Sequence, residues 1–290
     1  MLELRPINKT PEHNYPPFKN GRFLEEYFYD YYQNLNDDIK QNYIYIDIFW
    51  LNLHMLNRFD INKIEEYVNN KCLLAKQQNK KAFTICQWDD NIQINKPDNL
   101  IVFSIGTSID IPLPLIVEDI DNKLEQVEEI PFDDKKYLCS FVGTYTHNCR
   151  QIMYNKLSNK NDKWYMNVRQ NWDIIINPNL IIDFVEKTKY SKFGLAPRGY
   201  GPSSFRFFEI IQMNVIPIYI HDGDNALPFK EEIDYSLFSL TYHIDDIDNI
   251  EKDLLNISDT KYNIMLNNLK KIKHRFNMKD TCDYIIRKLI

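Results

Sequence analysis

The chain has 290 residues and a mass of 34.9 kDa, with 44% hydrophobic and 26% charged residues. These proportions exclude a disordered polypeptide, and the length fits two compact domains of roughly 140 residues each. The net charge is −6, and the sequence has no dense basic patch of the kind that binds duplex nucleic acid, so we expect no nucleic-acid partner.

The charge is distributed unevenly between the two halves. Residues 1–137 contain 15 Lys and Arg against 23 Asp and Glu, whereas residues 138–290 contain 20 against 18. The five cysteines form no Cys-x-x-Cys pair, which argues against a disulfide framework and against a zinc site. The sequence begins without an apolar signal segment, and no stretch approaches about 18 apolar residues. We therefore expect a soluble, cytoplasmic protein with no transmembrane segment, whose second half could bind a small anion.

The first half alternates apolar strands with helices. Residues 21–35 predict an aromatic-rich helix, and the dense apolar run 43–50 predicts a buried strand. A predicted helix over 60–79 precedes two further short strands, 82–87 and 100–105. Strands that are separated by helices indicate an α/β layer with a parallel sheet.

The second half repeats this alternation after a charged segment, 118–136, which is the predicted linker. Its predicted strands are 138–143, 192–196 and 215–220, and its predicted helices are 146–159, 178–190, 203–213, 245–256 and 260–289. Pro178 suits the first turn of its helix. Pro217 indicates that its strand lies near a sheet edge or that the proline is at the start of the strand. We therefore expect two domains, 1–137 and 138–260, followed by a closing helix at 261–290.

Four of the seven glycines fall between residues 194 and 223. Within this region a strand leads into a Gly-x-Gly-Pro loop that opens a helix, and residues 191–206 contain three cations and no acid. Backbone N–H groups at a helix N-terminus attract anions, so a diphosphate fits here, with Arg198 on its phosphates and Glu209 on a ribose. The alternative is that these residues only stabilise the fold: Ser203 would then be a helix cap, and Arg206 and Glu209 would form a surface ion pair.

The residues around this loop resemble the C-terminal signature of the exostosin-like glycosyltransferases. The shared features, in order, are Pro197-Arg198-Gly199, Ser204-Phe205-Arg206-Phe207-Phe208-Glu209, Ile216-Pro217-Ile218, Asp222 and Leu227-Pro228-Phe229. Upstream, Phe141-Val142-Gly143-Thr144 with Arg150 resembles the family's entry to its second domain. A weaker likeness in the first half runs through Tyr27–Tyr32, Phe49-Trp50 and Thr84–Asp90.

The resemblance implies an α/β fold of the GT-B class, in which two Rossmann-like domains face a cleft. It also implies an inverting glycosyltransferase that moves a hexose or pentose, usually from a UDP-sugar, to a hydroxyl of a carbohydrate or glycoprotein glycan. The nucleotide-sugar donor would bind the second domain and the acceptor the first. The implied donor-binding residues are Gly143, Thr144, Arg150, Arg198, Gly199, Tyr200, Gly201, Ser203, Ser204, Arg206, Glu209 and Asp222.

A GT-B site can stabilise the leaving diphosphate with arginine and a helix dipole, without a divalent metal. The chain does contain three Asp-x-Asp triplets, at Asp119/Asp121, Asp222/Asp224 and Asp246/Asp248. In a chain this rich in aspartate, chance alone gives roughly two such triplets. The triplets therefore do not predict a metal site, and we expect no metal cofactor.

Inverting transfer needs a general base that takes the proton of the acceptor hydroxyl. Asp89 and Asp90 are the first candidates because they follow strand 82–87 at its C-terminal end, where ligands of parallel sheets bind. Trp88, next to them, could stack on the acceptor sugar. The alternatives are His54, His147 and Asp47. Each candidate also has an ordinary explanation, as a solvated turn residue or, for His147, as the start of a helix.

Two other functions fit the same sequence features. A degenerate member of the family would bind a sugar nucleotide without turnover, and a carbohydrate-binding or assembly module would use the fold only as a scaffold. Hydrolysis of UDP-sugars in the absence of acceptor would distinguish a live transferase from a scaffold.

Overall fold

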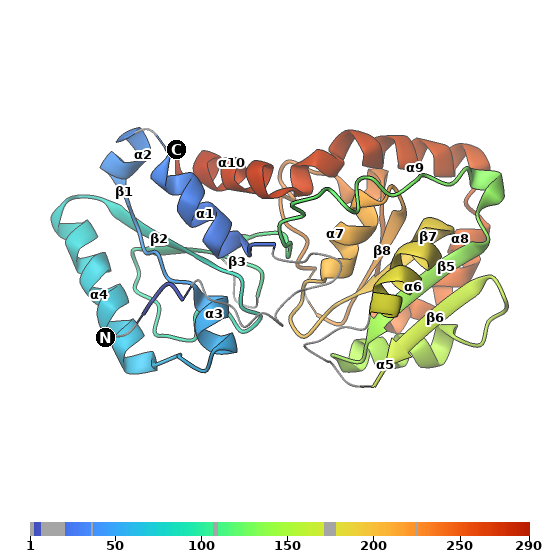
Figure 1. The fold of residues 1–290 in the computed structure, drawn as a ribbon, viewed down its shortest axis with the longest axis horizontal. Coiled ribbons are helices and arrows are strands. Elements are labelled where there is room, and N and C mark those ends of the chain that lie inside the picture. The colour runs from blue at the N-terminus through green and yellow to red at the C-terminus, as the bar shows by residue number, and fades with distance from the viewer. Residues whose placement is uncertain (1–2, 7–20, 36, 107–109, 171–177, 224) are drawn as a thin grey trace. The chain divides into compact units, whose positions relative to one another are not determined.

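The structure is a computed structural model that describes residues 3–6, 21–35, 37–106, 110–170, 178–223 and 225–290. The chain divides into two units, each with its own sheet (Figure 1). Unit 1 contains Arg22–Glu118 and Asn277–Ile290, and unit 2 contains Asp119–Phe276. The sequence predicts the domain boundaries at 137/138 and 260/261 instead, because it offers only the charged segment 118–136 as a linker.

Unit 1 is built on a parallel sheet in the order β1-β2-β3-β4. The strands are β1 (Tyr43–Tyr45), β2 (Lys81–Cys86), β3 (Leu100–Ser104) and β4 (Ile111–Pro112). The helices are α1 (Leu24–Gln33), α2 (Asp37–Asn42), α3 (Trp50–Met55), α4 (Ile61–Gln77) and, from the end of the chain, α10 (Met278–Leu289). Because β2 and β3 are almost wholly buried, they are apolar on both faces, as strands covered on both sides are.

The long helix α4 shows how the sequence specifies its own boundaries. Asp60 caps its N-terminus, because a side-chain oxygen accepts the backbone N–H of Lys63 at 3.3 Å. Ile64, Val68 and Cys72 recur every four residues and are buried against the sheet. The predicted helix 60–79 is therefore confirmed.

Two carboxylates near the start of α1 are buried. Glu26 accepts the backbone N–H of Phe23, the N-cap residue of α1, at 2.9 Å. Glu25, which is 1% exposed, accepts the backbone N–H groups of Gln87 at 2.6 Å and Leu51 at 3.1 Å. Glu25 thus ties α1 to the end of β2 and to the first turn of α3.

Unit 2 is built on a five-stranded parallel sheet in the order β6-β5-β7-β8-β9. The strands are β5 (Tyr137–Thr144), β6 (Trp164–Arg169), β7 (Ser191–Pro197), β8 (Ile216–His221) and β9 (Leu240–His243). The helices are α5 (Asn148–Leu157), α6 (Pro178–Lys189), α7 (Phe205–Gln212), α8 (Ile250–Leu255) and α9 (Asp259–Ile272). Short 3-10 turns occupy η1 (Phe132–Asp134), η2 (Tyr235–Leu237), η3 (Ile244–Asn249) and η4 (Lys273–Phe276).

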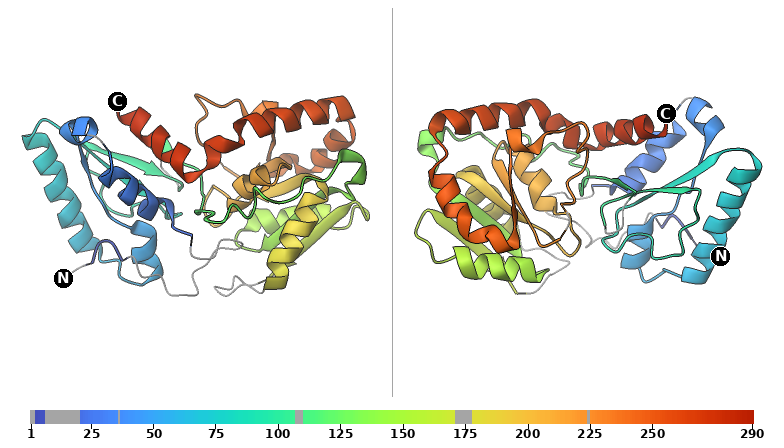
Figure 2. Two further views of the ribbon diagram at one scale, coloured as in Figure 1. Left: turned by 45° about the horizontal axis from the view of Figure 1, so that its top comes forward. Right: turned by 180° about the vertical axis from the view of Figure 1, so that it is seen from behind.

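The connections of unit 2 put its helices on both faces of the sheet (Figure 2). Right-handed crossovers place α5, which leads from β5 to β6, on one face, and α6 and α7, which lead in the other direction, on the opposite face. Met153 and Leu157 of α5 share one core cluster with Ile250 of α8 and Tyr262 of α9. Two α/β units with wholly parallel sheets confirm the predicted fold class, the paired Rossmann-like domains of the GT-B class.

Two predicted elements are wrong in extent. The apolar run 43–50 leaves the sheet after Tyr45, and its last residue begins α3. Ile46 and Ile48 are fully buried but lie outside any strand. An apolar run in the sequence therefore does not distinguish a buried strand from a buried connection. The predicted helix 260–289 is broken at η4, and Asn277 starts α10 by accepting the backbone N–H of Asp280 at 2.7 Å.

The position of Pro217 is confirmed, because it lies at the start of β8, one of the two places predicted for it. The strand itself lies inside the sheet, between β7 and β9. The sequence did not predict β6 or β9. The predicted linker packs on unit 2 from Asp119 onward, because Leu124 and Ile130 are buried there.

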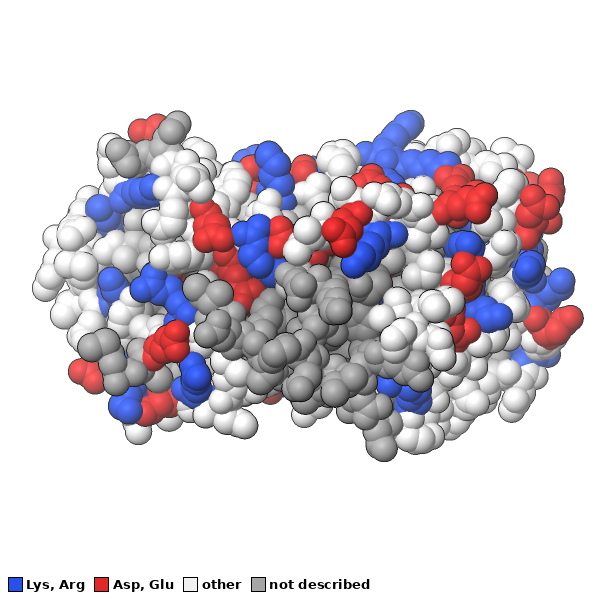
Figure 3. Space-filling model, in the orientation of Figure 1, with Lys and Arg blue, Asp and Glu red and all other residues white. Residues whose placement is uncertain are grey.

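Charges of both signs are mixed on the face that Figure 3 shows. On the face shown in Figure 3, Lys and Arg side chains alternate with Asp and Glu, and the described residues of this face form no continuous basic patch.

Candidate functional site

The carboxyl ends of β5 and β7 lie next to each other in the middle of the unit 2 sheet. From β5 the chain goes on to β6 on one side, and from β7 it goes on to β8 on the other side. Ligands of open parallel sheets bind outside the carboxyl ends of strands at such a reversal. The fold therefore brings Gly143-Thr144 and Pro197-Arg198-Gly199, two motifs far apart in sequence, to the preferred ligand position.

Arg150, in the first turn of α5, ties these two strand ends together. Its Nη1–H donates to the backbone oxygen of Thr144 at 3.0 Å, and its Nε–H donates to the backbone oxygen of Arg198 at 2.9 Å. The side chain is 8% exposed, and its guanidinium lies 5.5 Å from the ring centre of Phe141. Arg150 thus fixes the position of the backbone on both sides of the switch point.

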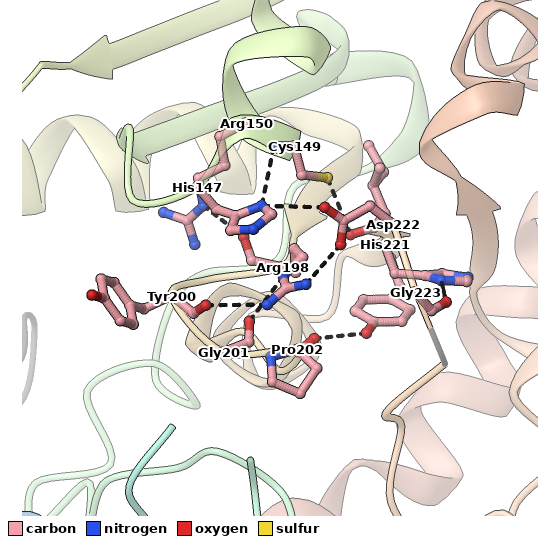
Figure 4. A network of polar contacts seen from close by, with 12 residues as sticks. His147, Cys149, Arg150, Arg198, Tyr200, Gly201, Pro202, His221, Asp222 and Gly223 are labelled. Atoms are coloured by element: carbon pink, nitrogen blue, oxygen red, sulfur yellow. Dashed lines mark hydrogen bonds and ion pairs between the residues drawn. The ribbon is translucent and has the colours of Figure 1, made fainter. Parts of the chain in front are cut away.

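Asp222, directly after β8, is held between a guanidinium and an imidazole (Figure 4). Its Oδ1 accepts from Arg198 Nη1 at 2.7 Å, and its Oδ2 lies 3.4 Å from Nδ1 of His147. Burial acts to raise the pKa of Asp222, but the hydrogen bond and the charge of Arg198 outweigh it and hold that pKa below its usual range. The carboxylate is therefore ionised at neutral pH and compensates the charge of Arg198.

The loop between β7 and α7 is folded around the Arg198 side chain. The Nε–H of Arg198 donates to the backbone oxygen of Gly201 at 3.2 Å, and its Nη2–H donates to that of Tyr200 at 3.1 Å. The N–H of Gly199 donates to the backbone oxygen of Ser203 at 2.8 Å, and a Cβ on Gly199 would lie 3.2 Å from that oxygen. The Tyr200 side chain is exposed and points away from the network (Figure 4).

Arg206 and Glu209, one turn apart on α7, form an ion pair. Arg206 also donates from Nε to the backbone oxygen of Val142 at 2.8 Å, and its guanidinium lies 3.5 Å from the ring centre of Phe184. Glu209 is 4% exposed, and this burial raises its pKa even though Arg206 acts in the opposite direction. Glu209 is thus buried beside β5 and Arg206 is largely covered, with 19% of its side chain exposed, so the alternative of a solvated surface pair is wrong.

Two serines precede this helix. Ser204 is the N-cap residue, but its side chain makes no capping hydrogen bond. Its Oγ is buried and has no hydrogen-bond partner among the described residues. Ser203 is 5% exposed and is not the N-cap, contrary to the structural alternative. A buried hydroxyl without a hydrogen bond costs free energy. Helix capping does not explain the buried Ser204 hydroxyl, because this side chain makes no capping bond.

The sequence profile of the exostosin GT47 domain matches residues 70–257, which is well over half of the chain. The chain belongs to this family. The match includes every donor-binding residue that the sequence predicts, from Gly143 to Asp222, and also the stretch from Trp88 to Asp90.

Relatives in the family match part of the chain in sequence. Two probable glycosyltransferases of Arabidopsis thaliana are 26% and 24% identical to it over 176 residues, which are 59% of this chain and 34% of each relative. The chain thus spans about a third of the length of the curated relatives that it matches. A crystal structure of the pneumococcal O-GlcNAc transferase GtfA in complex with UDP and GlcNAc has a TM-score of 0.38 at 9% identity, covering 92% of this chain and 59% of that one.

Among the described residues, no group of three or more His, Cys, Asp and Glu side chains is arranged to hold a metal ion. Asp224, the second acid of one Asp-x-Asp triplet, lies outside those residues. No helix in the described parts of the chain is both long enough and apolar enough to cross a membrane.

The candidate acceptor residues lie at the carboxyl end of β2 in unit 1. The Trp88 ring stacks on His54, with ring centres 4.5 Å apart, and His54 stacks in turn on Phe59 at 4.0 Å. Burial lowers the pKa of His54 to about 4, although the charge of Asp90 acts against it. Asp89 is partly buried and Asp90 is exposed. The structure thus brings His54 to the same strand end as Asp89 and Asp90.

The last alternative base, Asp47, is already engaged. Its Oδ1 accepts from the Tyr67 hydroxyl at 3.2 Å, and its Oδ2 pairs with Arg5 at 3.0 Å. Both carboxylate oxygens of Asp47 are thus already engaged within unit 1. This geometry favours the strand end at β2 over Asp47.

Two contacts of the site were missed by sequence reasoning. Arg169 lies opposite Thr144 in the register of β6 and β5, and its Nη2–H donates to the Thr144 hydroxyl at 3.1 Å. Its strand was not predicted, although apolar and polar residues alternate over Trp164–Arg169. The proximity of His147 to Asp222 joins residues from α5 and β8, and no spacing along the sequence signals it.

Proposed function

We propose that this chain is an inverting glycosyltransferase that moves a hexose or pentose from a UDP-sugar to a hydroxyl of a carbohydrate or glycoprotein glycan. The observation that carries the proposal is the ion pair on α7 between the buried Glu209 and the partly buried Arg206, beside the switch point of unit 2, in a chain that belongs to the exostosin GT47 family. A buried ion pair is expensive to desolvate, so a binding role explains it better than stability does.

In this proposal unit 2 binds the donor. The diphosphate lies at the loop between β7 and α7, near the first backbone N–H groups of α7, with Ser204 and Arg198 as further donors. Glu209, one turn deeper on α7, accepts the ribose hydroxyls, and Arg206 fixes its orientation. Arg150 and Gly199 shape the backbone on which the nucleotide rests.

The transfer needs no redox partner. The acceptor oxygen attacks the anomeric carbon and forms the new C–O bond while the bond from that carbon to the diphosphate oxygen breaks. UDP leaves with the bonding electron pair, and attack from the opposite side inverts the configuration. N–H groups and arginine stabilise the negative charge that develops on the diphosphate, so the proposal includes no metal.

Unit 1 supplies the acceptor side. Asp89 or Asp90 takes the proton of the attacking hydroxyl, and Trp88 contributes an aromatic surface for a sugar ring. The partly buried position of Asp89 and the stacking of Trp88 on His54 support this assignment.

The experiment is a thermal-shift screen of nucleotides and sugar nucleotides, followed by a hydrolysis assay. A ligand at 100 times its dissociation constant stabilises the folded protein by about 2.7 kcal/mol. We expect UDP and a UDP-sugar to raise Tm in the presence of EDTA, and the UDP-sugar to be slowly hydrolysed. If no nucleotide raises Tm, or if binding disappears with EDTA, the proposal is wrong.

A further inference from the structure

His147 occupies a specific place in the unit 2 site. It is the N-cap residue of α5, and the backbone N–H of Cys149 donates to its Nδ1 at 3.2 Å. The same Nδ1 lies 3.4 Å from Oδ2 of Asp222. An imidazole nitrogen either carries a proton and donates or lacks one and accepts, so only one of these two contacts can be a hydrogen bond at a time.

The surroundings of His147 decide which contact forms. Burial and then the charge of Arg198 lower the pKa of His147, Arg150 acts in the same direction, and Asp222 acts against them. The neutral ring is therefore the main form at neutral pH. Its Nδ1 accepts from Cys149, and its proton is on Nε2. Asp222 meanwhile keeps its hydrogen bond from Arg198.

This arrangement leaves the Nε2–H of His147 as a donor at the site. No hydrogen bond of Nε2 occurs within the described part of the chain. In Figure 4 His147 and Arg198 lie on two sides of Asp222, and Arg150 is close to both. The charge of Asp222 is compensated by Arg198, so the ring sits among groups that favour an anion.

We propose that His147 is a donor-binding residue whose Nε2–H donates to a phosphate oxygen of the sugar nucleotide. The inference rests on the proposed function and extends it, because it assigns to His147 a role in holding the diphosphate rather than in taking the acceptor proton. The Nδ1 atom contributes by capping α5, which fixes the orientation of the ring.

A consequence for proton uptake follows. A phosphate beside the imidazole stabilises its protonated form, so the pKa of His147 rises when the nucleotide binds. Binding then takes up protons, and the affinity for UDP increases as the pH falls through the range in which the bound ring becomes protonated. The facing charges named above set that range: Arg198 and Arg150 oppose protonation, and Asp222 favours it.

The test compares two variants that separate the ring nitrogens. In His147→Asn the short amide oxygen can replace Nδ1 as the cap of α5, but nothing replaces Nε2. In His147→Gln the longer amide can place an N–H near the position of Nε2. The matched control is His274→Asn, since His274 is exposed in η4. Calorimetry with UDP gives affinity and proton uptake between about pH 5.5 and 8, and Tm reports the cap.

We expect His147→Asn to keep Tm and to bind UDP about tenfold more weakly, as for the loss of a charge-assisted hydrogen bond, with His147→Gln in between. The proton uptake that His147 contributes should be absent in His147→Asn. UDP contributes the same titration to both proteins, so the difference in proton uptake between the wild type and the variant reports His147 alone. If the wild type binds UDP and His147→Asn matches it in affinity and proton uptake, this inference fails while the proposed function stands. If the wild type does not bind UDP at all, the proposed function fails, and the inference fails with it.

Discussion

The Nε–H of Arg150 donates to the backbone oxygen of Arg198, 2.9 Å away, so a side chain of α5 positions the residue that follows β7. A second bond from Arg150 reaches the end of β5 at Thr144. A resemblance to the family marks Arg150 only as part of a motif, whereas the geometry indicates that it acts on the backbone around the switch point. The bound phosphates would then contact groups that Arg150 holds in place.

Replacing Arg150 with lysine should therefore destabilise unit 2. A single ammonium cannot reach both carbonyl groups in the geometry of the planar guanidinium, and buried carbonyls are left without partners. We expect the free energy of unfolding to fall by about 2 kcal/mol or more, measured by urea denaturation. Arg58→Lys is the control, because Arg58 forms an exposed pair with Glu3. Equal midpoints for Arg150→Lys and the wild type would contradict the positioning role.

Removing the Arg198 side chain should weaken nucleotide binding. Arg198→Ala loses a charged donor and also the two bonds that shape the loop at Tyr200 and Gly201. We expect UDP binding to weaken by about 1.5–3 kcal/mol in calorimetry, both with and without EDTA. An unchanged affinity in Arg198→Ala would show that the diphosphate binds elsewhere.

The sequence predicted most of the regular elements but not how far some of them extend. Helix α4 was predictable because Asp60 and the stripe from Ile64 to Cys72 both mark it locally. The break before α10 was not, because the apolar periodicity continues through it while the two helices bury their faces in different units. The apolar periodicity of a segment indicates which residues are buried, but it does not indicate against which other segment they pack.

The same limit applies to the site. The glycine-rich loop is continuous in the sequence, and Arg206 and Glu209 lie within one turn of α7, so both features were visible without the structure. The contacts of Asp222 with His147 and of Arg169 with Thr144 join separate strands and helices, and only the order of the strands brings them together. The partial burial of Arg206 likewise involves Phe184, which belongs to another helix.

His54 should make the stability of unit 1 depend on pH. Burial lowers its pKa from 6.5 to about 4 in the folded state, so the unfolded chain binds the proton more tightly. The stabilisation is complete above the unfolded pKa and is lost as the pH falls from about 6.5 through about 4. We expect wild-type stability to decrease over this range relative to His54→Gln, and an NMR titration to place the His54 transition near pH 4. A His54 transition near pH 6.5 would contradict this environment.

Helix α10 should be required for the stability of unit 1. Ile285 is fully buried, whereas Ile286, the next residue of the same helix, is only half-buried. Ile285→Ala should lower the free energy of unfolding by about 2–5 kcal/mol, and Ile286→Ala should lower it much less. Thermal unfolding of the two variants measures the difference. A chain that ends at Phe276 and remains as stable and active as the full chain would show that α10 is dispensable.

The last prediction concerns the general base, and it separates binding from chemistry. Asp89 and Asp90 follow Trp88 at the carboxyl end of β2, the edge of a parallel sheet where ligands bind. An asparagine at the base position keeps the size and shape of the side chain but cannot take up the acceptor proton. General-base loss typically lowers the rate by about 10²–10⁴-fold and leaves donor binding intact.

We therefore expect Asp89→Asn or Asp90→Asn to bind UDP with normal affinity and to transfer sugar at least about a hundredfold more slowly. Asp98→Asn is the matched control, since Asp98 is an exposed aspartate just before β3, at the opposite end of the strands. Near-normal turnover in both variants would move the base to another residue. His54 would then be tested first, because it stacks on Trp88 at the same strand end and stays neutral, and thus able to accept a proton, down to about pH 4. His147 and Asp47 would follow, the first already assigned to the diphosphate and the second already paired with Arg5.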